Sequence, residues 1–237
     1  MQPAPDTPPL DGTAWVLAAL PGAELVPAAP ATLRFEGGRA AGSDGCNRYT
    51  VAYTTQGDTI GFPSSAASTR MACPPEVMGQ ADAFLAALAG ARRYRVEGGR
   101  LQLMAADGSL RAALAPQPQL LAGTSWTATA IHNGKGAVAS LVPGSTVTLT
   151  FGADGQASGS AGCNRYTARY EAEGSSLRFQ PAAATRRMCP GEALMAQEQA
   201  FLKALESVAT ARVEGQRLEL RTASGSLVTT LQRDGGS

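Results

Sequence analysis

The four cysteines are the residues of this sequence best suited to covalent chemistry. Four cysteines permit three disulfide pairings, and sequence alone does not choose among them. Cys46 and Cys73 have nearly the same spacing as Cys163 and Cys189, so a bridge within each half of the chain is favoured. Buried free thiols and redox or metal chemistry are the alternatives. A thioredoxin-like dithiol needs C-x-x-C, which is absent, and zinc needs close cysteine or histidine pairs.

Polar residues beside the cysteines recur in both halves and are the candidate site. They are Asn47, Arg48, Thr69 and Arg70 in the first half, matched by Asn164, Arg165, Thr185 and Arg186 in the second. One interpretation is a small anion or carboxylate pocket next to the disulfide. The other, which we favour, is that these residues tie a loop to the rim of a sheet.

The other ionisable residues do not predict catalysis. Glu97 recurs as Glu214 in a turn, whereas Asp44 becomes Ala161, so the acid beside the cysteine is not kept. His132 is the only histidine, and we expect it in an exposed loop. G-x-S-x-G, Walker A and H-E-x-x-H motifs are absent. We therefore expect no enzymatic activity, no catalytic residue, no cofactor and no metal.

The cysteines lie in strings that occur twice. The matched strings are GSDGCNRYT and GSAGCNRYT, TRMACP and TRRMCP, FLAAL and FLKAL, and VEGGRLQL and VEGQRLEL. Their constant order predicts two tandem copies of one domain. The expected boundaries are a flexible tail over 1–10, a first domain over 11–115, a linker over 116–121, a second domain over 122–232 and a tail over 233–237.

Each copy has strand signals on both sides of one helix signal. Turns at Gly37-Gly38, Gly98-Gly99 and Asp107-Gly108 separate short apolar runs, as in β-hairpins. Residues 74–90 instead place Val77, Ala81, Phe84, Leu85 and Leu88 on one helical stripe. The second copy offers Leu194, Phe201, Leu202, Leu205 and Val208. We expect a mainly β fold with one helix per domain, in which the helix covers the open face of a curved antiparallel meander.

The repeated string also has a purely structural interpretation. Its glycines let the chain bend closely, and its cysteine anchors that bend to the start of the helix. Asn47 and Asn164 tolerate a left-handed backbone and can bond nearby amides. The tyrosines that follow can bury their rings while the hydroxyl reaches a partner. Arg48 and Arg165 are expected to bond carbonyls where the sheet turns.

These strings resemble the META domain (HslJ-like) family over both copies, residues 11–115 and 122–232. The second copy departs at TRRMC, where Met188 stands next to the cysteine and Met71 in the first copy does not. The resemblance implies a compact curved sheet with one helix, broadly lipocalin-like in its strand course. It also implies an exported or lipid-anchored envelope protein linked to stress or antibiotic tolerance. Such a resemblance informs the fold more than the function.

Composition and charge narrow the function classes. The net charge of +1 and the 5% of aromatic residues argue against nucleic-acid binding. No run of 18 apolar residues occurs, which predicts no transmembrane segment. The proline-rich start, MQPAPDTPPL, is typical of an exported protein whose leader has been removed. With the paired cysteines, this start predicts the periplasm or cell envelope.

Three functions follow in order of preference. The first is a non-catalytic binding or interaction module of the cell envelope, whose partner is an envelope protein or a small ligand. The second is a carrier of a small apolar ligand in the concave sheet, which requires an apolar cavity of several hundred Å³. The third is a hydrolase or thiol enzyme, which requires reactive thiols.

Overall fold

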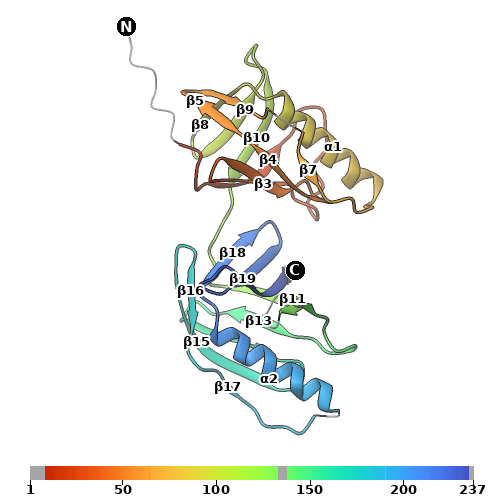
Figure 1. Ribbon diagram of the computed structural model, residues 1–237, viewed down its shortest axis with the longest axis vertical. Helices are drawn as coiled ribbons and strands as arrows, with labels where there is room; N and C mark the ends of the chain where they lie inside the picture. The colour runs from red at the N-terminus through yellow and green to blue at the C-terminus, as the bar shows by residue number, and fades with distance from the viewer. Residues whose placement is uncertain (1–8, 64, 133–137, 190, 235–237) are drawn as a thin grey trace. The chain divides into compact units, whose positions relative to one another are not determined.

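A computed structural model describes residues 9–63, 65–132, 138–189 and 191–234 of the chain. The chain divides into two compact units, Met1–Gln117 (unit 1) and Pro118–Ser237 (unit 2). The described part of each unit consists of an antiparallel sheet and one helix (Figure 1). The mainly β architecture with one helix per domain is therefore confirmed.

The sheet of unit 1 curls back toward its own start. Its strands are β1 (Ala14–Ala19), β2 (Thr32–Glu36), β3 (Arg39–Ser43), β4 (Arg48–Ala52), β5 (Thr54–Gln56), β6 (Thr59–Gly61), β7 (Ala67–Ser68), β8 (Arg93–Glu97), β9 (Arg100–Met104) and β10 (Leu110–Pro116). They pair in the order β5-β6-β8-β9-β10-β1-β2-β3-β4-β7. Only Tyr53 separates β4 from β5 in the chain, although these strands lie toward opposite ends of the hydrogen-bonded path.

Glycine pairs make the tight hairpins of unit 1. Gly37 and Gly38 join β2 to β3 with φ of 56° and 73°, and Gly98 and Gly99 join β8 to β9 with φ of 57° and 73°. Two successive positive φ angles form the hairpin turn that matches the twist of the flanking strands. The turns that the sequence predicts at these positions are therefore confirmed.

The strands of unit 2 repeat this course. They are β11 (Thr124–His132), β12 (Val138–Ala139), β13 (Thr148–Phe151), β14 (Gln156–Ser160), β15 (Arg165–Glu173), β16 (Ser176–Phe179), β17 (Ala183–Ala184), β18 (Thr210–Glu214), β19 (Arg217–Arg221) and β20 (Leu227–Arg233). β15 runs unbroken where unit 1 has β4 and β5. It pairs with β14 along one edge and with β16 along the other.

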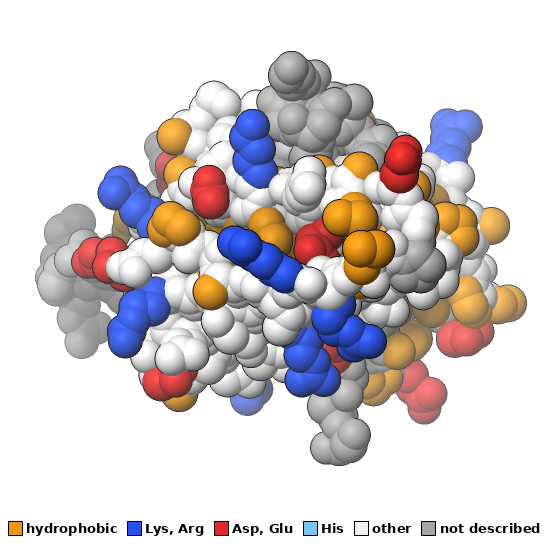
Figure 2. Space-filling model, turned by 90° about the horizontal axis from the view of Figure 1, so that it is seen from below, with side chains coloured by type: hydrophobic (Ala, Val, Ile, Leu, Met, Phe, Trp, Pro, Cys, Tyr) orange, Lys and Arg blue, Asp and Glu red, His pale blue; other side chains and the backbone are white. Residues whose placement is uncertain are grey.

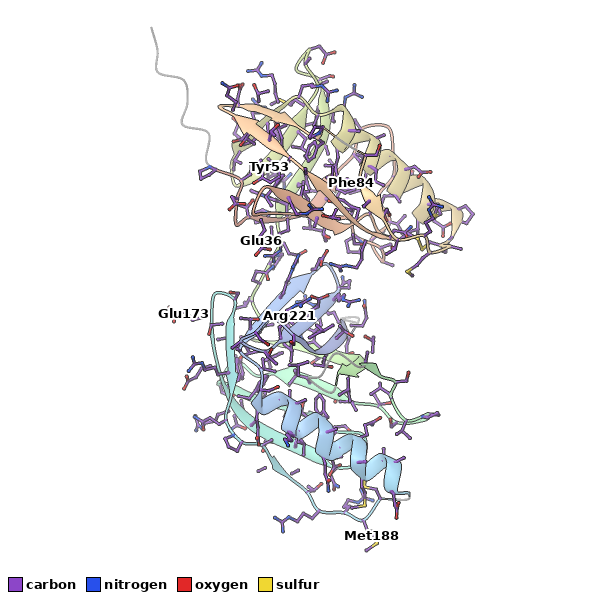
Figure 3. All side chains as sticks on the ribbon, in the orientation of Figure 1. Glu36, Tyr53, Phe84, Glu173, Met188 and Arg221 are labelled. Carbon is purple, nitrogen blue, oxygen red and sulfur yellow. A yellow bond between two sulfur atoms is a disulfide. The ribbon has the colours of Figure 1, made fainter. Side chains whose placement is uncertain are left out.

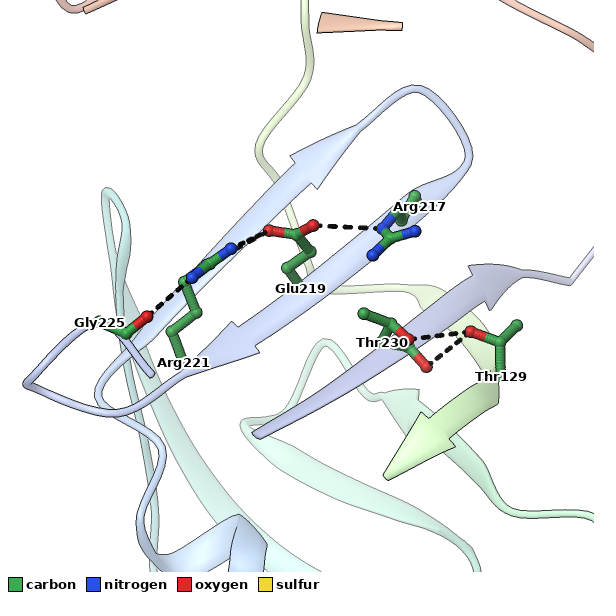
Figure 4. Close-up of polar contacts among 6 residues, drawn as sticks. All are labelled: Thr129, Arg217, Glu219, Arg221, Gly225 and Thr230. Atoms are coloured by element: carbon green, nitrogen blue, oxygen red, sulfur yellow. Dashed lines mark hydrogen bonds and ion pairs between the residues drawn. The ribbon is translucent and has the colours of Figure 1, made fainter. Parts of the chain in front are cut away.

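The sheet of unit 2 closes into an eight-stranded barrel because β11 also pairs with β20. Trp126 lies opposite Arg233, and Ala128 lies opposite Leu231. The hydroxyls of Thr129 and Thr230 lie 3.0 Å apart across the same strand pair (Figure 4). The curved antiparallel sheet that the sequence predicts is therefore present in unit 2, where it closes into a barrel. A lipocalin-like strand course stays a prediction.

The outer side of β19 carries a row of ion pairs. Glu219 lies 3.2 Å from the Nε of Arg217 and 2.8 Å from an Nη of Arg221, and Arg221 also donates to the Gly225 carbonyl at 2.7 Å (Figure 4). Unit 1 has Gln102 in place of Glu219, and Gln102 accepts a bond from Arg95 at 2.8 Å. The two sheets therefore share a course but differ in charge at this position, where the carboxylate of Glu219 is buried between the two arginines.

One helix packs on each sheet through an apolar stripe. α1 (Pro75–Gly90) begins after Pro74, where a missing backbone N–H costs nothing. Phe84 is buried, points toward the sheet (Figure 3) and meets the ring of Tyr49 edge-on at 5.9 Å. In α2 (Glu192–Glu206), Phe201 meets Tyr166 in the same way at 5.6 Å. The predicted helices and their buried phenylalanines are confirmed.

Large side chains fill the interiors of both units. The largest fully buried ones are Trp126, Tyr166, Phe35, Phe84, Phe151, Phe201, Leu33, Ile60, Leu101, Leu103, Leu114 and Leu149. An apolar carrier needs an empty space of several hundred Å³ in this position. The packed interiors therefore count against the carrier hypothesis.

The packed units extend into the segments expected to be tail and linker. Leu10 is 2% exposed in the core of unit 1, and Leu121 is 5% exposed in the core of unit 2. Pro116 pairs with Trp15 as the last residue of β10, and Arg233 ends β20. The sequence-based boundaries missed these positions because a single apolar residue beside prolines shows no periodicity. No helix in the described ranges has the length and apolar character to cross a membrane.

Candidate functional site

In each unit one disulfide joins a bend in the sheet to the segment that precedes the helix. Cys46 is bonded to Cys73 and Cys163 to Cys189, so all four cysteines are paired within their own unit. The alternative of free thiols is wrong for this structure. We call Cys46, Asn47 and residues 69–73 the disulfide corner of unit 1. Cys163, Asn164 and residues 185–189 form the disulfide corner of unit 2.

A buried asparagine holds the corner of unit 1. The Oδ1 of Asn47 accepts bonds from the Thr69 hydroxyl at 2.9 Å and from the Met71 backbone N–H at 2.7 Å. The Thr69 hydroxyl in turn accepts a bond from the backbone N–H of Arg48 at 3.1 Å. These three bonds link the segment before the helix to the start of β4.

The corner of unit 2 repeats these bonds. The Oδ1 of Asn164 accepts from the Thr185 hydroxyl at 2.7 Å and from the Arg187 N–H at 2.8 Å. Its Nδ2 also donates to the Arg187 carbonyl at 3.2 Å. No described non-glycine residue has a positive φ, so Asn47 and Asn164 do not adopt the left-handed backbone that asparagine tolerates. The asparagines act through their side-chain amides.

A carboxylate supports each asparagine, but it comes from a different position in each unit. In unit 1 one oxygen of Asp44 accepts the N–H groups of Cys46 at 2.8 Å and of Asn47 at 2.6 Å. Position 161 of unit 2 is alanine. There Glu198 of α2 reaches back and accepts the Asn164 backbone N–H at 2.8 Å.

The two units exchange acid and alanine reciprocally at these two positions. Unit 1 has Ala81 where unit 2 has Glu198, and unit 2 has Ala161 where unit 1 has Asp44. The second oxygen of Glu198 also accepts the side-chain amide of Asn164 at 3.0 Å. The carboxylate is therefore kept although its position is not. A residue-by-residue alignment of the two copies does not reveal this exchange, because the acid moves from the bend before β4 to the helix.

A glutamine from each helix binds a neighbouring loop, and it is buried in unit 1 and half-buried in unit 2. The sequence-based candidate site does not include it. Gln80 accepts the Val26 N–H at 2.7 Å and donates to the Ala29 carbonyl at 2.8 Å. Gln197 accepts the Val142 N–H at 2.6 Å. A polar residue that recurs on the apolar stripe of both helices is the signal that could have found it.

Gly45 and Gly162 leave room for these glutamines. They have φ of 105° and 107°, which L side chains rarely adopt. A Cβ atom would lie 2.7 Å from the Nε2 of Gln80 in unit 1 and 2.7 Å from that of Gln197 in unit 2. The second glycine of the repeated string is therefore required by both backbone conformation and space.

The first glycine and the tyrosine of the string share one partner. A Cβ at Gly42 would overlap the Thr32 carbonyl oxygen, and the hydroxyl of Tyr49 donates to that oxygen at 2.8 Å. In unit 2 a Cβ at Gly159 would overlap the Thr148 carbonyl oxygen, and the hydroxyl of Tyr166 donates to that oxygen, also at 2.8 Å. Burial raises the pKa of Tyr166 well above its usual value. This arrangement confirms the buried tyrosine that the sequence predicts.

The recurrent arginines do not converge on the asparagines. Arg70 and Arg186 are exposed on the outer side of the loops, and Arg48 and Arg165 are exposed on the sheet. Arg165 lines an open depression of about 340 Å³ together with Thr148, Ser158, Ser160 and Thr167. Arg186 is not part of that lining. The structure thus brings the asparagine, threonine and cysteines together and leaves the arginines outside.

Each corner also displays a methionine. Met71 is 60% exposed and Met188 is 93% exposed, and Met188 points away from unit 2 (Figure 3). Neither methionine therefore packs in a core. Basic and hydrophobic side chains lie side by side on the face drawn in Figure 2. We call Arg70 and Met71, and Arg186, Arg187 and Met188, the exposed rims of the corners.

Potential metal ligands gather at the corner of unit 2. One ligand atom each from Cys163, Cys189 and Glu198 lies within 4.8 Å of the others. The two sulfurs are bonded to each other, so this oxidised form offers no thiolate. The backbone of His132 ends β11, and its side chain lies outside the described residues.

Comparison with known proteins matches each half of the chain separately. A family model described as META domain matches residues 8–117 and 119–235. The chain is similar to an NMR structure of a protein from Burkholderia xenovorans, at 30% identity, over 52% of this chain and 93% of that one, with a TM-score of 0.44. No curated protein matches the chain.

Two further solved structures are similar over about half of the chain. One is an NMR structure at 23% identity, covering 49% of this chain and 93% of its own, with a TM-score of 0.38. The other is a crystal structure of a DUF4847 family protein from Bacteroides vulgatus ATCC 8482, at 14% identity. It covers 50% of this chain and 98% of its own, with a TM-score of 0.36.

Proposed function

Both halves of the chain belong to the META domain family, and on that premise we propose a non-catalytic interaction module of the cell envelope. The module binds a partner protein through the exposed rims of its disulfide corners. The partner offers an apolar pocket bordered by carboxylates. The family resemblance supports a role in stress or antibiotic tolerance, and the two disulfides support an oxidising compartment such as the periplasm.

The observation that carries this proposal is the exposed methionine beside exposed arginine in both corners. The asparagine, threonine and cysteine side chains of the corners already bond within the protein. Met188 is 93% exposed and has no packing role that would explain it. Methionine suits adaptable contact surfaces because its side chain is flexible and polarisable, and arginine binds carboxylates with two parallel bonds.

Rigidity favours the corners as contact surfaces. Each loop is fixed at one end by a disulfide and in its middle by bonds to an asparagine. A surface that is already ordered loses less conformational entropy when it binds. The rims can therefore present methionine and arginine at little cost in backbone ordering.

Site-specific photo-crosslinking in living cells tests the contact surface. A photoreactive residue replaces Met188 or Met71 in the full chain, and the control replaces exposed Arg178 of β16. We expect one discrete adduct from each rim position. The adduct at Met188 should be lost when Arg186→Ser and Arg187→Ser are combined, and the adduct at Met71 should be lost in Arg70→Ser. Equal adducts from the rim and the control, or none from either rim, would contradict the proposal.

Thiol labelling in the same cells tests the compartment. A maleimide polymer added before and after reduction should leave the chain unshifted before reduction and attach to four cysteines after it. Labelling without reduction would place the chain in a reducing compartment and remove the envelope from the proposal. The same outcome would restore the thiol enzyme as a candidate.

A further inference from the structure

We propose that unit 2, and not unit 1, becomes a metal site for Zn²⁺ when its disulfide is reduced. The ligands are the thiolates of Cys163 and Cys189 and one carboxylate oxygen of Glu198, with water in the fourth position. Thiolates and a carboxylate are ligands that zinc accepts in proteins. This site goes beyond the proposed interaction module and does not depend on it.

The ligand atoms are already close enough. They lie within 4.8 Å of one another, and the Cα atoms of the cysteines are 6.1 Å apart. With zinc–sulfur bonds of about 2.3 Å, two sulfurs of a tetrahedral site lie about 3.7 Å apart. Once the disulfide is broken, the two sulfurs need only move apart to this zinc-bound separation, so the site forms without a large movement of the backbone.

Contacts around the ligands hold them without the disulfide. Asn164 ties the Arg187 backbone in place through its Oδ1 at 2.8 Å and its Nδ2 at 3.2 Å, two residues before Cys189. Asn164 also donates to both oxygens of Glu198, at 2.8 Å from its backbone and 3.0 Å from its side chain. Each oxygen keeps a second lone pair. Hydrogen bonds of this kind orient carboxylates that bind metals.

The chemistry balances in two steps. A dithiol reductant breaks the sulfur–sulfur bond by supplying two electrons and two protons, and it becomes a disulfide itself. The metal then displaces both thiol protons to solvent and forms two metal–sulfur bonds and one metal–oxygen bond. Because oxidised sulfurs cannot ligate as thiolates, metal binding and the disulfide exclude each other.

Unit 1 is an internal control. Its cysteines have nearly the same Cα separation, 6.0 Å, but Ala81 stands where unit 2 has Glu198. Among the residues that the structure describes, unit 1 holds no comparable group of three ligands. Reduced unit 1 therefore offers two thiols without the carboxylate.

Metal titration of the reduced full chain tests the proposal, with Co²⁺ as a coloured substitute and Zn²⁺ in competition. One variant, Cys46→Ser with Cys73→Ser, keeps only the ligands of unit 2, and Cys163→Ser with Cys189→Ser keeps only those of unit 1. We expect one equivalent bound by the first variant, and at least about tenfold weaker binding by the second. The oxidised chain should bind no metal with a thiolate absorption band.

Two further variants isolate the carboxylate. Glu198→Gln should weaken binding at least about tenfold, with circular dichroism confirming that the variant folds. Asp44→Ala with Ala81→Glu gives unit 1 the arrangement of unit 2 and should add a second equivalent. Equal affinity of the two units, or no effect of either variant on metal binding, would overturn the proposal.

Discussion

At the scale of single residues, the repeated string is explained by hydrogen bonds and close approaches. Gly42 leaves room for a carbonyl, Gly45 for a helix glutamine, and Asn47 accepts two bonds from the loop before the helix. The same contacts return around Gly159, Gly162 and Asn164, so the recurrence has a structural cause. These contacts do not explain the exposed arginine and methionine of each rim.

The carboxylate exchange gives the first prediction. Asp44→Ala should lower the free energy of unfolding of unit 1 by about 2 kcal/mol, because two backbone N–H groups lose a charged acceptor. Adding Ala81→Glu should restore part of that loss by supplying the carboxylate from α1, as α2 does in unit 2. Urea unfolding measures both. A double variant no more stable than the single one would show that the exchange is coincidental.

Glycine geometry gives a second prediction with a matched control. Gly45→Ala should cost about 3 kcal/mol, because it combines a strained backbone with a Cβ that would lie 2.7 Å from both the Ala29 carbonyl oxygen and the Nε2 of Gln80. Gly57→Ala, at φ of 59° with no atom within 4 Å of the new Cβ, should cost only about 1 kcal/mol. Thermal unfolding of the two variants measures both losses of stability. Equal losses would mean that the close approach of Ala29 and Gln80 to Gly45 is unimportant for stability.

At the scale of elements, the tyrosine of each copy links the sheet to the helix. Tyr166 of β15 donates to the Thr148 carbonyl at 2.8 Å and places its ring against Phe201 of α2. The hydroxyl therefore stays neutral in the folded protein, and its pKa is raised by burial.

This raised pKa predicts alkaline sensitivity. In the unfolded chain tyrosine ionises near pH 10, whereas folded Tyr166 keeps its proton, so the stabilisation is complete below about pH 10 and falls as the pH rises further. Tyr166→Phe should reduce the loss of unfolding free energy at high pH. Tyr170, whose hydroxyl also donates to a carbonyl at 2.7 Å, is the control, and Tyr170→Phe should reduce that loss by a smaller amount. Urea unfolding on both sides of about pH 10 measures the effect. Identical pH dependence in the wild type and Tyr166→Phe would contradict it.

The elements also show what sequence can and cannot predict. The turns at Gly37-Gly38 and Gly98-Gly99 and the helix around Phe84 follow from residues close together in the chain. The closure of unit 2 joins β11 to β20, and no local pattern encodes the hydrogen bonds between the two strands. Glu198 could not be predicted as the counterpart of Asp44 because it stands at a different position in the repeat. Gln80 was not among the predicted site residues because the candidates were chosen from ionisable side chains and from the residues next to the cysteines.

At the scale of the whole molecule, the chain is two units that each contain their own core and their own disulfide. A residue change in one corner therefore acts first on its own unit. Among the residues that the structure describes, the units also differ: unit 2 has a hydrogen-bonded closed barrel and a group of three potential metal ligands formed by its two sulfurs and Glu198, and unit 1 has neither.

Removing one disulfide tests this independence. Cys46→Ala with Cys73→Ala should destabilise unit 1 by roughly 3 kcal/mol through the lost loop constraint and leave unit 2 nearly unchanged. Cys163→Ala with Cys189→Ala should do the reverse. Calorimetry of the full chain should show one transition moving in each variant. If both transitions move together, the units stabilise each other.

The Asp44 and Glu198 arrangement has a consequence for the gene. The two halves of the gene encode similar strings, and an exchange between them would join the first part of one unit to the last part of the other. An exchange point between the codons of the first cysteine and those of the helix would yield one hybrid with Ala161 and Ala81, and another with Asp44 and Glu198. The first hybrid lacks any acid to hold its asparagine, and the second crowds two acids onto one amide. Selection against both hybrids would help to keep the two halves of the gene distinct.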